Sequence, residues 1–143
     1  MFNFLKKKKI QKFTVNCKTD SIFINDTNIN FPTTYQTLLS ILKEPTRQIT
    51  TSKNYCIWDD FGISCSFENK ESILSINFYQ NKDKVSEYVA KKQFTGDLFL
   101  EDENITYSEF GKIGLGKIAI HRLGSEHETR FGFSIGINND YKV

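Results

Sequence analysis

Residues 55–67 read Tyr55-Cys-Ile-Trp-Asp-Asp-Phe-Gly-Ile-Ser-Cys-Ser-Phe67, and this stretch decides the fold of the surrounding chain. It holds the only tryptophan and two of the three cysteines. The tetrapeptide at 59–62 predicts a turn, because an aspartate side chain can bond nearby backbone N–H groups and Gly62 can adopt unusual backbone angles. We therefore expect a β-hairpin over residues 55–67.

Burial fixes the register of this hairpin. Side chains alternate across a strand, so a slip of one position would turn Trp58 and Phe67 toward the opposite face. The expected pairs are Trp58 with Ile63, Cys56 with Cys65 and Asn54 with Phe67. One face then carries Cys56, Trp58, Ile63, Cys65 and Phe67, and the other carries Tyr55, Ile57, Ser64 and Ser66.

The composition indicates one domain. A chain of 143 residues can bury a real core, and its 14% of aromatic residues offset the modest apolar fraction of 38%. It contains only two prolines and no low-complexity tract that would act as a linker. We expect a single α+β domain over residues 13–143, which begins after a flexible basic tail over residues 1–12.

Positive charge is concentrated at the N-terminus. The tail contains no acid, and subtracting its five lysines from the net charge of +2 leaves about −3 for the remainder, unlike a nucleic-acid-binding surface. Its apolar run is too short for a signal peptide or a membrane span, so we expect a cytoplasmic protein with reduced, buried cysteines. The tail lysines are Lys6, Lys7, Lys8, Lys9 and Lys12, and the first four of them could alternatively touch an anionic membrane surface.

One helix is expected over about residues 33–43. Thr33 can cap its start, and Gln36 three residues later would complete a capping box. An apolar stripe follows at helical spacing, and Pro45 would end the helix because the residue before a proline is disfavoured in the helical region. The stripe consists of Tyr35, Leu38, Leu39 and Leu42.

Two further hairpins share one sequence pattern. Residues 23–29 and 99–105 both read Phe, aliphatic, any, Asp, any, Asn, Ile. Turns at Asp26-Thr27 and Asp102-Glu103 would pair Ile24 with Ile29 and Leu100 with Ile105. The pattern is open to two interpretations, a duplication that gives two weakly similar halves or the general preference of Asp and Asn for turns.

The other strands complete an α+β domain with a mostly antiparallel sheet of about seven to nine strands and one principal helix packed on it. Residues 107–116 are rich in glycine and are expected to form a loop. The small-residue face of the last strand indicates close packing against the helix or a partner. The remaining strands are expected at Phe13–Cys17, Leu74–Phe78, Ile118–Leu123 and Phe131–Ile137.

No motif predicts a reaction. Asp59 and Asp60 are adjacent and would point to opposite faces of a strand, so a turn with a solvated carboxylate is the favoured interpretation. An acidic enzyme site formed with Arg47 is the alternative. The histidines, His121 and His127, lack the spacing of a metal site, and Glu126 and Glu128 are expected in a loop. We therefore expect no catalytic residue, no metal and no cofactor.

Several motifs give the chain a family resemblance. The helix runs into Leu42-Lys-Glu-Pro45 and Arg47, similar to a Leu-Gly-x-Pro-x-Arg ending, with Lys43 in place of the glycine. Residues 55–63 fit a Tyr-x-x-Trp-Asp-Asp/Glu-x-Gly-Ile signature, and residues 94–98 fit Phe-x-Gly-x-Leu. These motifs resemble a family of small bacterial domains similar to immunity proteins of interbacterial toxin systems.

The resemblance implies a non-enzymatic protein that binds and neutralises a toxin encoded by a neighbouring gene. No nucleic-acid partner is expected. An acidic body would speed association with a basic partner. A membrane-peripheral accessory protein that uses the basic tail remains an alternative. The residues expected to contact the partner are Tyr55, Ile57, Asp59, Asp60, Phe61, Glu126 and Glu128.

Overall fold

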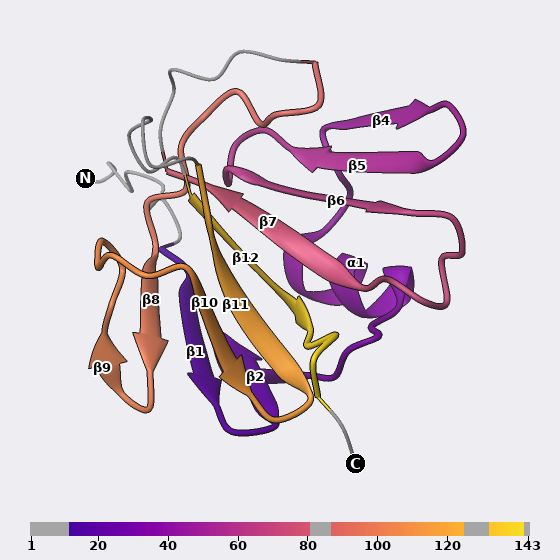
Figure 1. Cartoon of the computed structure of the whole chain (residues 1–143). Coiled ribbons are helices and arrows are strands. Elements are labelled where there is room, and N and C mark those ends of the chain that lie inside the picture. Colours follow the sequence, from indigo (N-terminus) through magenta and orange to yellow (C-terminus); the bar gives the residue numbers. More distant parts are fainter. Residues whose placement is uncertain (1–11, 81–86, 125–131, 142–143) are drawn as a thin grey trace, which may run out of the picture.

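The computed structural model describes residues 12–80, 87–124 and 132–141. These residues form one helix and twelve strands, and the strands divide between a five-stranded and a seven-stranded sheet (Figure 1). The predicted α+β class, with mostly antiparallel strands and one principal helix, is confirmed. The structure adds a division into two sheets, with more strands than the seven to nine expected.

The five-stranded sheet has the order β3-β2-β1-β8-β9, and its β1–β8 pair is parallel. Its strands are β1 (Thr14–Lys18), β2 (Ser21–Ile24), β3 (Thr27–Ile29), β8 (Asp97–Leu100) and β9 (Glu103–Asn104). The seven-stranded sheet is antiparallel, with the order β10-β11-β12-β7-β6-β5-β4. Its strands are β4 (Arg47–Thr50), β5 (Asn54–Trp58), β6 (Ile63–Phe67), β7 (Ser75–Tyr79), β10 (Lys112–Leu115), β11 (Ile118–Leu123) and β12 (Gly132–Ile137). The helix, α1, spans Tyr35–Leu42.

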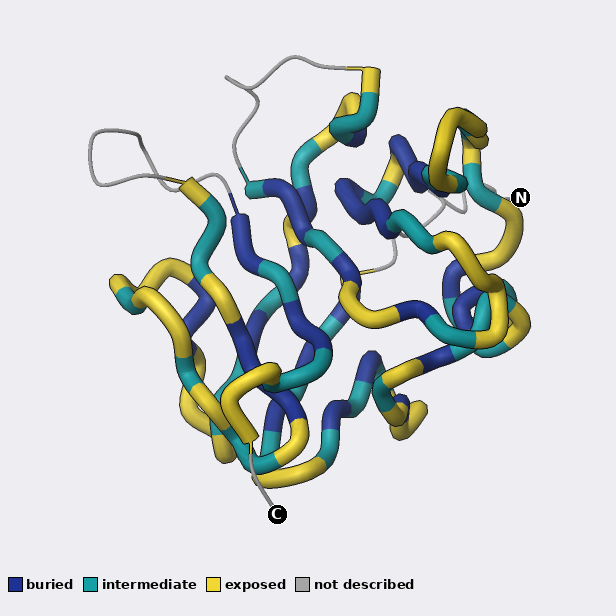
Figure 2. Tube along the Cα trace, turned by 45° about the vertical axis from the view of Figure 1, so that its right-hand side comes forward, coloured by how far each residue is buried: buried dark blue, intermediate teal, exposed yellow. Residues whose placement is uncertain are grey.

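The main core lies between the seven-stranded sheet on one side and the five-stranded sheet with α1 on the other (Figures 1 and 2). Val15 of β1, Leu38 of α1 and Trp58 of β5 all belong to this one buried cluster. Phe78 and Phe133 stack at its centre with ring centroids 4.6 Å apart. Burial of apolar area at about 25 cal/mol per Å² makes this cluster the main source of stability.

The register predicted for the hairpin at residues 55–67 is confirmed. Strands β5 and β6 pair Trp58 with Ile63 and Cys56 with Cys65. The face that carries these four residues belongs to the main core. The turn is closed by Gly62, which has φ +73° and whose N–H donates to the Trp58 carbonyl over 3.1 Å.

The helix begins one residue later than predicted. Thr34 is the N-cap, and its side chain accepts the Thr37 N–H over 3.1 Å. Thr33 is unavailable because its backbone N–H and carbonyl both pair with Ile73 in an isolated bridge. The helix ends before Lys43, whose backbone has φ +67° and ψ −164°, a conformation almost restricted to glycine.

Replacing Lys43 with glycine is therefore expected to raise the free energy of unfolding by about 1 kcal/mol. Relief of about 1–3 kcal/mol of backbone strain outweighs the entropy cost of about 0.5–1 kcal/mol of a new glycine. Urea denaturation measures the change. Ser40→Gly is the matched control, because Ser40 lies inside α1 and the same substitution there should be destabilising by about 1 kcal/mol. A destabilised Lys43→Gly would contradict this interpretation.

The registers predicted for the two hairpins of shared pattern are wrong by two residues. Ile24 pairs with Thr27 and Leu100 with Glu103, so the turns lie at Asn25-Asp26 and Glu101-Asp102. A shift of two keeps every side chain on its predicted face. Asn25 and Glu101 adopt positive φ values of +54° and +48°, which are typical of tight hairpin turns.

Two further expectations differ from the structure. Residues 112–115 form β10 rather than loop, because Gly116 with φ +67° permits a tight turn into β11. The small-residue face of β12 is crowded by its neighbour β7, since a Cβ at Gly132 would lie 1.8 Å from the Phe78 carbonyl oxygen. Within residues 87–92 there is no helix. None of the described helices is long and apolar enough to cross a lipid bilayer.

Candidate functional site

The carboxylate of Asp59 lies at the end of β5 and is bound from several directions. Arg47 donates from Nε to Asp59 Oδ2 over 2.8 Å and from Nη2 to Oδ1 over 3.0 Å. The Lys91 backbone N–H also donates to Oδ1, over 2.9 Å. The Asp59 side chain is 7% exposed and that of Arg47 is 26% exposed. This arrangement is a bidentate ion pair with a buried carboxylate, whereas the sequence indicated only a turn in which the second carboxylate, that of Asp60, is solvated.

The same pair holds the segment at 87–92 on the seven-stranded sheet. Arg47 donates to the carbonyls of Glu87 and Val89 over 2.7 and 3.2 Å. Through its hydrogen bond, Arg47 holds the pKa of the Asp59 carboxyl below its usual value, while burial opposes that shift. A carboxylate with both oxygens engaged is poorly placed to accept a substrate proton. The Arg47–Asp59 ion pair therefore holds the loop at residues 87–92 in place.

Other residues of the signature at 55–63 and of the Phe-x-Gly-x-Leu motif at 94–98 make contacts that stabilise the fold. Trp58 Nε1 donates to the Lys43 carbonyl over 2.9 Å and so ties the hairpin to the end of α1. A Cβ at Gly62 would lie 2.2 Å from the Phe94 nitrogen, and a Cβ at Gly96 would lie 2.2 Å from the Phe13 carbonyl oxygen. Both glycines allow residues 93–97 to pass close to other backbone. Packing within the fold therefore accounts for Trp58, Gly62 and Gly96 in these motifs.

The residues expected to contact a partner do not form one surface. Ile57 and Asp59 are buried, which corrects their assignment as surface contacts. Tyr55 is half-buried against the Tyr88 ring, with centroids 4.6 Å apart, and Phe61 packs against Phe13. Asp60 is exposed and forms an ion pair with Lys92 over 3.3 Å. Glu126 and Glu128 lie outside the described residues, as do Lys6, Lys7, Lys8 and Lys9.

The cysteines and histidines offer little chemistry. Cys17, Cys56 and Cys65 are buried free thiols, and burial raises the pKa of Cys17 to about 12. His121 is exposed on β11, and His127 lies outside the described residues. In the part of the chain that the structure describes, no group of three His, Cys, Asp or Glu side chains could hold a metal ion.

A row of side chains crosses the outer face of the five-stranded sheet, the face turned away from the core. Asn16 of β1 lies between Phe23 of β2 and Phe99 of β8. Asn28 of β3 lies beyond Phe23, and Asn104 of β9 lies beyond Phe99. The row reads Asn-Phe-Asn-Phe-Asn and is symmetric about Asn16.

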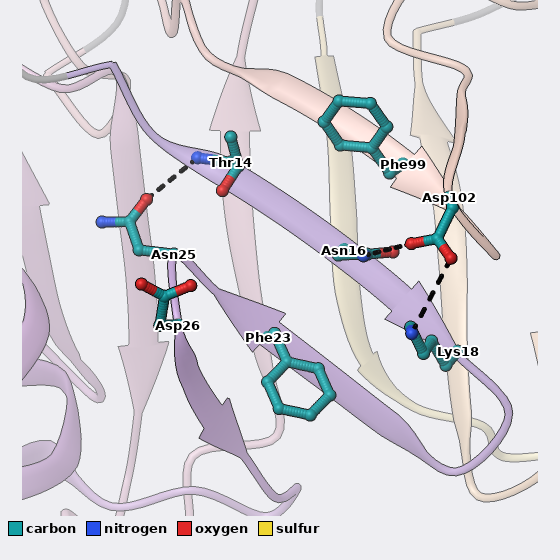
Figure 3. A pocket seen from close by; sticks show the side chains of 8 residues that line it. All are labelled: Thr14, Asn16, Lys18, Phe23, Asn25, Asp26, Phe99 and Asp102. Atoms are coloured by element: carbon teal, nitrogen blue, oxygen red, sulfur yellow. Dashed lines mark hydrogen bonds and ion pairs between the residues drawn. The ribbon is translucent and has the colours of Figure 1, made fainter.

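The three central residues of this row, Asn16, Phe23 and Phe99, line a hollow of about 470 Å³ (Figure 3). The half-buried rings of Phe23 and Phe99 flank Asn16, about 10 Å apart at the backbone because neighbouring strands are about 4.8 Å apart. Polar groups lie at both ends of the hollow: Thr14, Asn25 and Asp26 at one end, and Lys18 and Asp102 at the other.

Asn16 is only partly satisfied at the centre of the hollow. Its Nδ2 donates to Asp102 Oδ1 over 3.0 Å, and its buried Oδ1 has no hydrogen-bond partner. A buried acceptor without a partner costs about 1–3 kcal/mol. Residues kept at such a cost are often functional. Asn16 therefore marks this face as the candidate site.

Replacing Asn16 with valine is expected to raise the free energy of unfolding by about 1 kcal/mol. The substitution removes the unsatisfied oxygen and places a β-branched residue in the middle of a strand, at the loss of one exposed hydrogen bond. Thermal unfolding measures the change. The control is Asn28→Val, on the edge strand β3, which should change stability by less than about 0.5 kcal/mol. A clear loss of stability in Asn16→Val would contradict this account.

Sequence reasoning did not select this face. It predicted the surface around residues 55–61, because those residues form the distinctive signature. The signal that pointed to the outer face was the repeated pattern at 23–29 and 99–105, since it contributes Phe23 and Phe99 at equivalent positions. The two copies of the pattern flank β1 because β8 pairs with β1, and this long-range pairing is not visible in the sequence.

Comparison with known proteins gives one match. Residues 14–115 match the model of a family described as Domain of unknown function (DUF7738). This range covers more than half of the chain, which therefore belongs to that family. It includes the signature hairpin and both flanking hairpins of the five-stranded sheet. No curated protein and no solved structure matches the chain.

Proposed function

We propose that this protein is a non-enzymatic binding module, an immunity-like protein that neutralises a toxin encoded by a neighbouring gene in the bacterial cytoplasm. The observation that carries the proposal is the outer face of the five-stranded sheet, where Phe23 and Phe99 flank Asn16 in a hollow. Aromatic side chains in such pockets commonly supply the main anchoring contacts of protein interfaces.

The state of the acidic residues supports binding over catalysis. Asp59 is engaged by Arg47 and by the Lys91 N–H. Asp60 projects from a turn with a side chain that is 72% exposed and pairs with Lys92, so it lies on the open surface rather than in an enclosed site. An enzyme site centred on this pair would need a rearrangement of the hairpin.

The net negative charge of the body supports a basic partner. Two acids, Asp26 and Asp102, line the hollow itself, and two exposed acids lie on the same hairpin as Asp102: Glu101 in the β8–β9 turn and Glu103 in β9. Opposite charge on the partner would speed association and disfavour competing acidic proteins. The proposed partner is therefore a basic protein surface rather than a nucleic acid.

Co-expression with the product of the adjacent gene tests the proposal. We expect a stable complex on gel filtration and survival of cells that otherwise die when that product is expressed alone. The matched control is the double variant Phe23→Ser/Phe99→Ser, which should fold but fail to rescue. Tyr107→Ser, at an exposed tyrosine outside the hollow, should rescue fully. Absence of binding by the wild-type chain would rule the proposal out.

A further inference from the structure

The two ends of the hollow are related by an approximate twofold axis through Asn16, perpendicular to the sheet. Strand β2 is antiparallel to β1 and β8 is parallel to it, so a half-turn places one flanking hairpin on the other. This rotation relates Phe23 to Phe99 and Asp26 to Asp102. The hollow therefore consists of two similar half-sites.

The hairpin turns repeat the same contacts with β1. At one end the Asn25 N–H donates to the Thr14 carbonyl over 2.7 Å, and Asn25 Oδ1 accepts the Thr14 N–H over 3.0 Å. At the other end the Glu101 N–H donates to the Cys17 carbonyl over 2.9 Å, and Glu101 Oε1 accepts the Thr19 N–H over 3.0 Å. Asp26 and Asp102 follow these two residues directly, each as the second residue of its turn.

The half-sites differ in charge, because one contains a cation, and in the contacts of Asn16, whose Nδ2 donates to Asp102. Lys18 lines the hollow and places its ammonium 3.9 Å from Asp102 Oδ2. The twofold-related position on β1 is Thr14, which carries no charge. Within residues 12–80, 87–124 and 132–141, no basic side chain forms an ion pair with Asp26. The described residues thus supply a cation to the half-site at Asp102 and none to the half-site at Asp26.

We propose that the half-site formed by Phe23, Asp26 and Thr14 binds an arginine or lysine side chain of the partner protein. This inference rests on the proposed function and names the chemistry of the contact. The incoming cation occupies the place that Lys18 takes at the related end. Asp26 supplies the opposite charge, the Phe23 ring offers an aromatic face, and the Thr14 hydroxyl offers an acceptor.

Arginine fits this half-site better than lysine. A guanidinium is planar, stacks on an aromatic ring and can present two N–H groups to one carboxylate, whereas an ammonium acts as a point charge. The open outer face admits a long side chain from above the sheet (Figure 3). A partner whose contact surface projects an arginine would therefore match both the ring and the carboxylate.

A peptide titration tests the contact without the partner. The probe is N-acetyl-Gly-Ser-Arg-Ser-Gly-amide, followed by ¹H–¹⁵N correlation spectra of the full chain. We expect saturable shifts at the amides of Thr14, Phe23, Asn25 and Asp26. The same peptide with citrulline, a neutral isostere of arginine, should bind at least about fivefold more weakly. Equal shifts with both peptides, or shifts confined to other residues, would overturn the inference.

Three variants refine the test. Asp26→Asn should weaken arginine-peptide binding at least about fivefold, because it removes the charge and keeps the shape. Thr14→Lys should have the same effect by filling the half-site from within, as Lys18 does at the other end. Asp102→Asn is the matched control and should change binding less than about twofold. Tight binding by Thr14→Lys would contradict the proposed position of the cation.

The outcome can be separated from that of the proposed function. If the neighbouring product forms a complex that Asp26→Asn leaves unchanged, the function stands and the arginine contact is wrong. If the arginine peptide binds at Asp26 and the neighbouring product does not bind, the contact chemistry stands and the partner assignment is wrong.

Discussion

Asp59→Ala is expected to lower the free energy of unfolding by about 3 kcal/mol. Removing one member of a buried, hydrogen-bonded ion pair typically costs about 3–5 kcal/mol, because the remaining charge lies in poor solvent. Arg47 keeps a side chain that is 26% exposed, so water compensates part of the loss and the lower end of the range applies. Urea denaturation followed by tryptophan fluorescence measures the change.

The control for this prediction is Asp60→Ala, at the adjacent exposed carboxylate. Its surface ion pair with Lys92 should contribute less than about 1 kcal/mol. The amides of residues 87–91 should also lose protection from hydrogen exchange in Asp59→Ala and keep it in Asp60→Ala, because Arg47 and Asp59 bind that segment. Equal effects of the two substitutions would contradict the assigned role of Asp59.

The ion pair also predicts a pH dependence of stability. Arg47 holds the pKa of the folded Asp59 carboxyl below that of the unfolded chain. The stabilisation is therefore fully present above the unfolded pKa of about 3.9 and is lost as the pH falls through the lower, folded value. Urea titrations from pH 7 to pH 2 should show a smaller acid-dependent loss in Asp59→Ala than in the wild-type chain.

Trp58→Ala is expected to cost about 4 kcal/mol, the largest effect of a single substitution in this account. Trp58 is 1% exposed, and truncating a buried tryptophan costs about 3–5 kcal/mol through lost burial and the cavity that remains. The change also leaves the Lys43 carbonyl without its indole partner. Thermal unfolding monitored by far-ultraviolet circular dichroism measures the effect.

Trp58→Phe separates the two contributions. It keeps much of the buried ring and loses the hydrogen bond to the Lys43 carbonyl, so a cost of about 2 kcal/mol is expected. In a Lys43→Gly background the chain keeps the carbonyl and loses the backbone strain, so the same Trp58→Phe cost should persist. A Trp58→Phe variant as stable as wild type would show that the indole bond contributes nothing.

The signature hairpin was predictable because local chemistry and burial agree on one register. A slip of one residue between β5 and β6 would separate Trp58, Cys56 and Cys65 from their shared apolar face, and the turn that ends at Gly62 selects the observed pairing. The flanking hairpins were less determined. Their predicted and observed registers differ by two residues, and both bury the same side chains. In the observed registers Asn25 and Glu101 hydrogen-bond the backbone of residues 14–19, and these long-range bonds are not visible in the sequence.

The candidate site was less predictable than the fold. Asp59 resembles an ordinary turn aspartate until Arg47, twelve residues earlier in the chain, is placed opposite Ile57 by the β4–β5 pairing. Likewise, Phe23 and Phe99 share a pattern in the sequence, but only the parallel pairing of β1 with β8 brings them onto one face. Local pattern indicates which side chains share a face, whereas long-range pairing decides which faces meet.

The central claim is that the outer face of the five-stranded sheet binds the partner and that the signature hairpin is structural. The most direct test is the dissociation constant of the neighbouring gene's product, measured by calorimetry for Phe23→Ser/Phe99→Ser and for Asp60→Ala. We predict at least about a hundredfold weaker binding for the first variant, as expected for two aromatic anchors, and wild-type affinity for the second. Wild-type affinity in the first variant together with lost binding in the second would contradict the account.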